Sequence, residues 1–302
     1  MQQVSHRHLT WVDIENPTDK DILFLRENFE IHPLAIEEFA MPTYSARATR
    51  YSNCLYMTIH IPLFDAVQRT TYAGEIDIIL TATHVITGHQ KPIYQITQFM
   101  EKLLAGEGAR KLHMSKTPSH LLHEILEILV DSCFPRLDHI TQNIDAIEEG
   151  IFSGNERQMV REISIAKRDV LNFRRTILPQ RAILESITAQ PGNIVAPDIK
   201  AYFQDLIGTN VRLWSMLESA KETIASLEET NNTLLSEKIN SKMNFITIFT
   251  VIFIPMTLYA NVLGINVTTP LSQHPQGFLI HLAVMVFLSL STYLVFKKAK
   301  FL

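Results

Sequence analysis

Charged residues stop near the C-terminal end of the chain and leave two long apolar runs there. Asp, Glu, Lys and Arg make up 19% of the sequence, but none of them lies between Lys242 and Lys297. This interval holds apolar runs at 245–263 and 278–296, separated by turn-forming residues. A helix needs about 20 residues to cross a hydrocarbon core of roughly 30 Å, so each run is long enough to span a membrane. The alternative, a pair of buried helices in a soluble protein, is disfavoured because adjacent uncharged runs of this length are rare outside membranes.

Lysine residues predict the orientation of the two spans. Lys238 and Lys242 precede the first span, and a basic tail at 297–302 follows the second, whereas the loop at 264–277 contains no Lys or Arg. By the positive-inside rule, both termini are cytoplasmic and the loop faces outward. The N-terminal residues contain no apolar targeting segment, so we expect the preceding part of the chain to stay in the cytoplasm. The sequence thus predicts a multi-pass protein of the cell (inner) membrane.

The first third of the chain has the pattern of a mixed α/β domain, which we place at 1–115. Short runs rich in β-branched and aromatic residues predict strands at 9–14, 54–62, 75–80 and 84–87. Two short helices are expected at 19–28 and 33–39, the second with Pro33 in its first turn. The residues His6-Arg7-His8 are interpreted as a flexible terminus.

From Pro118 onward the apolar residues have the spacing of a helix, which predicts a second, helical cytoplasmic part at 116–197. A second helical run covers 156–187, and Pro191-Gly192 and Pro197 mark a break after it. In the run that begins at Pro118, before this second run, apolar residues recur at helical intervals: Leu121, Leu122, Ile125, Ile128, Leu129, Leu137, Ile140, Ile144 and Ile147.

The segment 198–263 predicts one long helix that continues directly into the first span at about 245–263. Its polar part, 198–241, contains no Pro and keeps an apolar stripe throughout. At 1.5 Å per residue, such a helix would measure roughly 100 Å. A helix of that length needs neighbours along its whole length, which favours an oligomer whose helices bundle around an axis.

Composition excludes several other classes of protein. The 27 Lys and Arg against 31 Asp and Glu give a net charge of −4, so no basic field attracts nucleic acid. Cys54 and Cys133 are too few for a disulfide framework. No phosphate-binding Gly-rich loop, nucleophile elbow or Cys-x-x-Cys pair is present, which argues against an enzyme, and no cofactor is expected. His120 and His123 share a helical face but lack a clear third ligand for zinc.

The residues IPMTLYANVLGIN at 254–266 combine Pro-x-Thr in the first span with Gly-x-Asn at its outer mouth. With the short loop, the second span and the Lys-rich tail, they resemble the CorA-type divalent-cation transporters. The family signature is usually Gly-Met-Asn, and the form Gly264-Ile265-Asn266 is more similar to the ZntB branch, which is associated with zinc. The segments HPLAIEE at 32–38 and YFQD at 202–205 also resemble family segments, so the resemblance covers most of the chain.

This resemblance implies a homopentamer. Each subunit would contribute an α+β cytoplasmic domain of αβα type, a long stalk helix in a central funnel, and two C-terminal transmembrane helices. The alternative for the polar residues of the first span is that they simply join helices within the lipid. The candidate selectivity and pore residues are Asn240, Ile246, Thr247, Ile254, Thr257, Asn261, Gly264, Ile265 and Asn266.

The chemistry of these residues suits a hydrated cation. A ring of Asn266 amides would bind the ion through its water shell, and apolar rings at Ile246 and Ile254 would gate by excluding water. Asn261 stands where the family usually has a small residue, so it either adds amides to the pore or disturbs close helix packing. The outer loop has no Asp or Glu, and its His274 is either a ligand for a softer ion such as Zn²⁺ or an ordinary exposed histidine.

Acidic residues at cytoplasmic subunit contacts hold a regulatory divalent ion in this family. The resemblance places this role on Glu37, Glu38, Asp205 and, on the preceding helix, Glu127. Like charges that face each other across an interface repel, and a divalent cation that screens the repulsion would favour the closed assembly. The alternative is that the four residues are ordinary solvated acids.

The favoured function is channel-like transport of a divalent metal cation of the Mg²⁺ or Co²⁺ type, because the acidic set is complete. Mg²⁺ is the expected transported and regulatory ion. Zn²⁺ transport, with or without proton coupling, is the first alternative because of the Gly-Ile-Asn form and the acid-free loop. A membrane-anchored oligomeric scaffold and a membrane-tethered enzyme are alternatives of other classes. The expected partners are further copies of the chain, the lipid bilayer and divalent cations.

Overall fold

The computed structural model of the chain describes residues 1–43, 46–189, 195–265 and 274–298. The chain divides into two compact units, Met1–Glu228 and Glu229–Leu302, which share the helix α9. The elements are β1 Gln2–His6, β2 Leu9–Glu15, α1 Asp19–Asn28, α2 Pro33–Phe39, β3 Arg47–Arg50, β4 Leu55–Asp65, β5 Thr70–Leu80, β6 His84–His89, α3 Tyr94–Ala105, α4 Glu107–His113, α5 Pro118–Asp131, α6 Cys133–Phe152, α7 Glu156–Ile177, α8 Gln180–Ala189, the 3₁₀ turn η1 Pro197–Ile199, α9 Lys200–Leu263 and α10 Gly277–Lys298.

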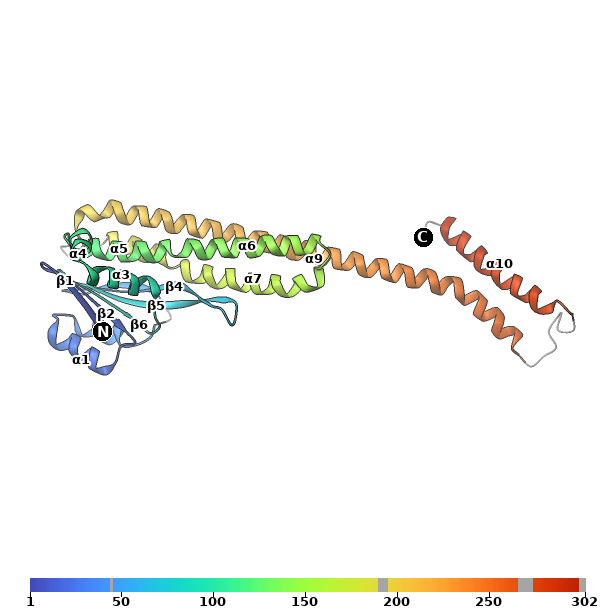
Figure 1. Cartoon of the computed structure of the whole chain (residues 1–302), viewed down its shortest axis with the longest axis horizontal. Helices are drawn as coiled ribbons and strands as arrows, with labels where there is room; N and C mark the ends of the chain where they lie inside the picture. Colours follow the sequence, from blue (N-terminus) through green and yellow to red (C-terminus); the bar gives the residue numbers. More distant parts are fainter. Residues whose placement is uncertain (44–45, 190–194, 266–273, 299–302) are drawn as a thin grey trace. The chain divides into compact units, whose positions relative to one another are not determined.

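A β-sheet forms the centre of the N-terminal unit (Figure 1). It has six strands in the order β1-β2-β6-β5-β4-β3. β2 and β6 are parallel, and the other neighbouring strands are antiparallel. The four predicted strands correspond to β2, β4, β5 and β6.

The strand β1 contradicts the expectation of a flexible terminus. It pairs with β2 from Gln2 to His6, and Arg7 makes the tight connection with a φ of 55°. Only Val4 of this strand is buried, so the alternation of apolar residues is too weak to predict it. The hydrogen bonds of the sheet edge, which do not depend on apolar side chains, hold the segment in place.

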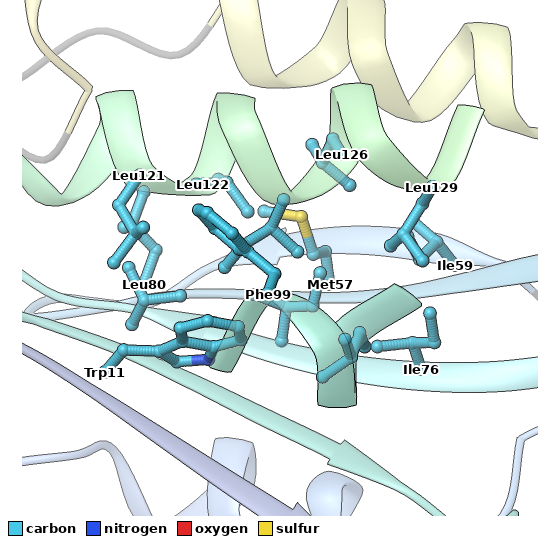
Figure 2. Close-up of a cluster of buried hydrophobic side chains, with 14 of the residues drawn as sticks. Trp11, Met57, Ile59, Ile76, Leu80, Phe99, Leu121, Leu122, Leu126 and Leu129 are labelled. Atoms are coloured by element: carbon cyan, nitrogen blue, oxygen red, sulfur yellow. The ribbon is translucent and has the colours of Figure 1, made fainter. Parts of the chain in front are cut away.

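Side chains alternate between the two faces of the sheet, and helices cover both faces. Trp11 and Met57 point into a large core that Phe99 of α3 and the apolar side of α5 complete (Figure 2). Their sequence neighbours Val12 and Tyr56 point to the opposite face, where α1 and α2 complete a second core. The unit is therefore an αβα sandwich, which confirms the expected fold class.

The helices α1 and α2 have the predicted bounds because their first residues satisfy the free backbone groups of a helix start. The Asp21 carboxylate accepts hydrogen bonds from the backbone N–H and the hydroxyl of Thr18, at 2.9 and 2.6 Å. The His32 ring accepts one from the backbone N–H of the second residue of α2, at 3.3 Å. A Cβ at Gly88 of β6 would lie 2.3 Å from the Phe39 ring, so the glycine lets α2 approach the sheet closely.

Two features of the helical region differ from the prediction. The helices α3 and α4 were not predicted, although the buried residues of α3 have helical spacing: Ile96, Phe99, Met100 and Leu103. The predicted run 156–187 is divided, since α7 ends at Ile177 and α8 begins at Gln180. Leu178 keeps helical dihedral angles, but the Pro179 that follows has no N–H and cannot donate the next hydrogen bond of the helix.

The helix α9 is continuous from Lys200 to Leu263, as predicted. In the N-terminal unit it is joined to α7 by ion pairs of Arg174 with Glu218 and of Lys167 with Glu228, both at 2.5 Å. Pro255 lies inside the helix, so the carbonyl of the residue four positions earlier has no helical N–H donor. Within the described residues, α9 and α10 are the helices long and apolar enough to cross a membrane.

Candidate functional site

One side of the apolar part of α9 packs against α10 in the C-terminal unit. Near the C-terminal end of α9, Tyr259 Oη lies 2.8 Å from His281 Nδ1. Near the other end, the two helices line a cavity of about 90 Å³, to which α9 contributes Asn244, Thr247, Ile248, Val251 and Ile252 and α10 contributes Thr292, Tyr293 and Phe296. These contacts define the side of the first span that faces the second.

The predicted pore residues lie on another side of α9. Positions 240, 247, 254 and 261 recur every seven residues, which keeps them close to one face of a helix. Ile246 and Ile254 are 56% and 57% exposed, and Asn240, Thr257 and Asn261 are exposed too. Thr247 is exposed and also lines the cavity, so it lies at the edge between the two sides. A stripe of amides, hydroxyls and isoleucines therefore runs along a surface of α9 that α10 does not cover.

The threonine hydroxyls of this stripe are oriented by the helix itself. Thr247 and Thr257 donate to the carbonyls of Met243 and Phe253 in the preceding turn, at 2.8 and 2.9 Å. With the hydrogen used in this way, the free lone pair of each oxygen is available to accept a hydrogen bond. Such a group interacts favourably with the water shell of a cation.

The helix ends at the predicted outer mouth. The Gly264 N–H donates to the carbonyls of Ala260 and Asn261, at 3.0 and 3.1 Å, and Ile265 is 57% exposed. A Cβ at Gly264 would make only ordinary contacts with the described residues, at 3.5 Å or more, so these residues give no steric reason for a glycine there. Asn266 lies outside the described residues. His274 Nδ1 accepts a hydrogen bond from the backbone of Gln276 at 3.2 Å.

The four cytoplasmic carboxylates of the predicted regulatory set lie in different environments. Glu37 and Asp205 are exposed, and Glu127 is half exposed with His123 Nδ1 at 4.0 Å from its carboxylate. Glu38 forms an ion pair with Arg47 at 3.0 Å. Across the described residues, no group of three or more His, Cys, Asp or Glu side chains is arranged to hold a metal ion. A single chain therefore does not assemble this site.

The histidines that share a face of α5 have local partners instead. His120 Nε2 lies 3.4 Å from Asp198 Oδ2, and both His120 and His123 meet the Tyr202 ring edge to face. Burial lowers the pKa of His120, while the nearby Asp198 carboxylate raises it. These contacts attach α5 to the start of α9.

Buried Asp77 and partly buried His281 are titratable groups that the sequence analysis did not single out. Asp77 on β5 accepts hydrogen bonds from Tyr56 and Thr58, and burial raises its pKa to about 7. His281 lies in the second span. The available signals were a polar residue within a strand of isoleucines and a single histidine in the second apolar run.

These observations define a class: a membrane protein in which a polar αβα domain is joined by one continuous helix to a pair of apolar helices. The family described as CorA-like Mg²⁺ transporter protein matches residues 6–298. The chain therefore belongs to the CorA-like Mg²⁺ transporter family, whose members transport divalent metal cations. The sequence-based expectation of this family is confirmed.

Individual relatives extend the match over most of the chain. YfjQ of Bacillus subtilis is 30% identical over 85% of this chain and 78% of its own length. The cobalt/magnesium transport protein CorA of Thermotoga maritima is 25% identical over 97% of this chain and 83% of its own length. The complete structure of the CorA magnesium transporter from Methanocaldococcus jannaschii has the same fold, with a TM-score of 0.84 at 20% identity, covering 100% of this chain and 95% of that one.

Proposed function

We propose that five copies of this chain form a pore that conducts a hydrated divalent cation, Mg²⁺ or Co²⁺, across the cell membrane, with both termini on the cytoplasmic side. The observation that carries the proposal is the stripe of amides, hydroxyls and isoleucines on α9, called the polar stripe below. It lies on a surface that α10 leaves uncovered, in a chain that belongs to a family of divalent-cation transporters. Isolated polar groups facing lipid are costly, so a stripe of them favours a water-filled conduit between copies.

The stripe supplies suitable groups for such a conduit. Amide and hydroxyl oxygens at Asn240, Thr257 and Asn261 interact with the outer waters of an ion that sheds its hydration shell reluctantly. Ile246 and Ile254 narrow the conduit with apolar rings that exclude water when the pore is closed.

Gly264 supports close contact between copies at the outer mouth. Because the described residues around it would tolerate a side chain, we attribute the small residue to a neighbouring helix or to the approach of the ion. Asn266, two residues later, is the proposed selectivity residue.

The regulatory role is proposed for carboxylates at contacts between copies. Glu37, Glu127 and Asp205 are exposed and available to a neighbouring chain, and one chain alone gathers no metal site in its described part. Glu38 contributes less to this set, because its ion pair with Arg47 already satisfies part of its charge.

Ion flux into proteoliposomes tests the proposal. We expect uptake of Mg²⁺ and Co²⁺ by the wild type and a loss of about ten-fold or more in Asn266→Ala, since each subunit would lose its amide from the selectivity ring. Ser289→Ala is the matched control, because the Ser289 hydroxyl bonds only within α10. A scaffold without transport predicts no flux through the wild type, and equal flux through the wild type and Asn266→Ala would contradict the proposed role of the amide.

Zn²⁺ is the second candidate for the transported ion. The Gly-Ile-Asn form and the absence of acidic residues from 264–277 favour it, because no carboxylate concentrates hard cations at the mouth. The same vesicles with Zn²⁺ and Ni²⁺, with and without a pH gradient, decide between the two. Faster uptake of Zn²⁺ than of Mg²⁺ would replace the first assignment with the second.

A further inference from the structure

A titratable residue lies inside the apolar second span. His281 occupies the second turn of α10, in the interval from which charged residues are absent. Tyr259 of α9 meets it, with Oη 2.8 Å from Nδ1 and the ring centroids 6.0 Å apart. An ionisable side chain within a span is costly and is usually retained for function.

The contact differs from the other side-chain hydrogen bonds of the two spans. It joins α9 to α10, whereas several hydroxyls donate to carbonyls of their own helix, namely those of Thr247, Thr250, Thr257, Ser289 and Thr292. The pair therefore connects the two helices at a specific level. Tyr259 precedes Gly264 by just over one helical turn, so this level is the outer end of the first span.

The hydrogen bonding of His281 is incomplete. A neutral imidazole has one donor and one acceptor nitrogen, and Nδ1 is engaged with Tyr259. Nε2 is buried and has no hydrogen-bond partner within the part of the chain that the structure describes. Leaving such a group unpaired destabilises a protein, so the histidine is not explained by stability alone.

Protonation would change this contact strongly. Both nitrogens would become donors, so Nδ1–H would donate to the Tyr259 oxygen in place of any acceptance from its hydroxyl, and the ring would gain a positive charge. The charge would have no carboxylate nearby, because the described residues from Lys238 to Lys298 include no Asp or Glu. The titratable group that faces His281 from α9 is Tyr259, while His274 and Tyr293 lie two turns before and three turns after it along the chain.

We propose that His281 acts through Tyr259 as a positioning residue for the outer mouth and that its protonation lowers transport. The inference rests on the proposed pore. Neutral His281 pairs with the Tyr259 hydroxyl, 2.8 Å from Nδ1, and this contact holds the end of α9, which carries Asn261. Protonated His281 becomes the donor of this hydrogen bond and places a positive charge beside the mouth in each of five copies, where it repels an arriving divalent cation.

The test is the pH profile of Mg²⁺ flux in proteoliposomes, between about pH 5.5 and 8, the range in which histidines titrate. We expect the wild-type flux to fall by about five-fold or more toward the acidic end. His281→Asn keeps an acceptor near the place of Nδ1 but does not titrate, so it should retain most of the flux at pH 8 and lose the pH dependence. His281→Phe removes both properties and should lower the flux at every pH.

Two controls separate this effect from other consequences of acid. His274→Asn removes the other histidine of the outer side and should leave the pH profile unchanged. Tyr259→Phe removes the hydroxyl without altering the ring, and it should shift the midpoint of the profile. Hydrogen–deuterium exchange at the imidazole C2 position, read by mass spectrometry, follows the titration of His281 itself and should show the same shift.

The outcomes distinguish this inference from the proposed function. If the wild type and His281→Asn share one pH profile, or if His274→Asn abolishes the pH dependence, the role of His281 is wrong and the pore stands. If His281 does not titrate in this range by C2 exchange, the inference also fails. If the wild type conducts no cation at any pH, the proposed function fails and this inference fails with it.

Discussion

At the scale of single residues, Asp77 on β5 shows how burial changes the chemistry of a carboxyl group. Its side chain is 7% exposed, and Tyr56 and Thr58 each donate to Oδ1 at 2.7 Å. Burial outweighs these hydrogen bonds and raises the pKa to about 7. The folded domain therefore binds a proton at Asp77 more tightly than the unfolded chain does.

This pKa predicts a loss of stability as the pH rises. Because the folded pKa is raised, the contribution of Asp77 is fully present below the unfolded pKa near 4 and is lost as the pH rises through about 7. Between pH 6 and pH 8 the free energy of unfolding should fall by about 1.4 kcal/mol from this group. Asp77→Asn, which keeps an acceptor oxygen but cannot titrate, should lack this decrease.

Chemical denaturation of the purified protein at the two pH values measures the difference. Asp19→Asn, a change at an exposed residue of α1, is the matched control and should keep the wild-type pH dependence. An equal decrease in Asp77→Asn and the wild type would show that this carboxyl group is ionised in both states.

At the scale of elements, local signals explain which parts were predictable from sequence. The bounds of α1 and α2 follow from Thr18, Asp21 and Pro33, which act within one turn of the helix. The strand β1 depends on hydrogen bonds to β2 rather than on its own side chains, so its polar sequence gave no signal. The seven-residue spacing along α9 predicts that the residues of the polar stripe share one side of the helix. The contact between His281 and Tyr259 depends instead on how α9 and α10 pack against each other, and spacing along the sequence does not predict that.

The two sides of α9 predict different reactivity of introduced cysteines. In the assembled protein, cysteines at 254 and 261 should react with a small water-soluble thiol reagent, because these positions face the proposed conduit. A cysteine at 252 should react at least about ten-fold more slowly, since Ile252 lines the cavity against α10. The native Cys54 and Cys133 are buried, and burial raises the pKa of both thiols, so they add little background.

Flux measured before and after the reagent completes this experiment. Modification at 254 or 261 should block transport, and modification at 252 should not. Equal rates at all three positions, with no effect on flux, would contradict the assignment of the stripe to a conduit.

At the scale of the whole molecule, the regulatory role of the four cytoplasmic carboxylates stays a prediction. Asp205 and Glu37 are exposed, and neither belongs to a cluster of three or more His, Cys, Asp or Glu side chains within the described part of one chain. Sequence patterns within one chain carry no distances across an interface between copies, which is why the set remains a prediction.

The charge of Asp205 should set the Mg²⁺ sensitivity of the assembly. We expect native mass spectrometry to give a complex of five 34.5 kDa chains, and Mg²⁺ to protect this complex from protease. Asp205→Lys should raise the half-protecting Mg²⁺ concentration by about five-fold or more, because it replaces an attraction for the ion with a repulsion. Glu222→Lys makes the same charge change at another exposed residue of α9 and should have little effect. Unchanged protection in Asp205→Lys would remove this residue from the sensor.

The proline within α9 has a mechanical consequence. Residue 255 withholds one hydrogen bond from a ladder that otherwise runs from Lys200 to Leu263, and its ring crowds the preceding turn. Elastic bending of the helix is therefore concentrated at this level, while the segments before and after it remain comparatively stiff. The last two turns of α9 accordingly follow a hinge at Pro255, so they can tilt while the preceding part of the helix stays straight.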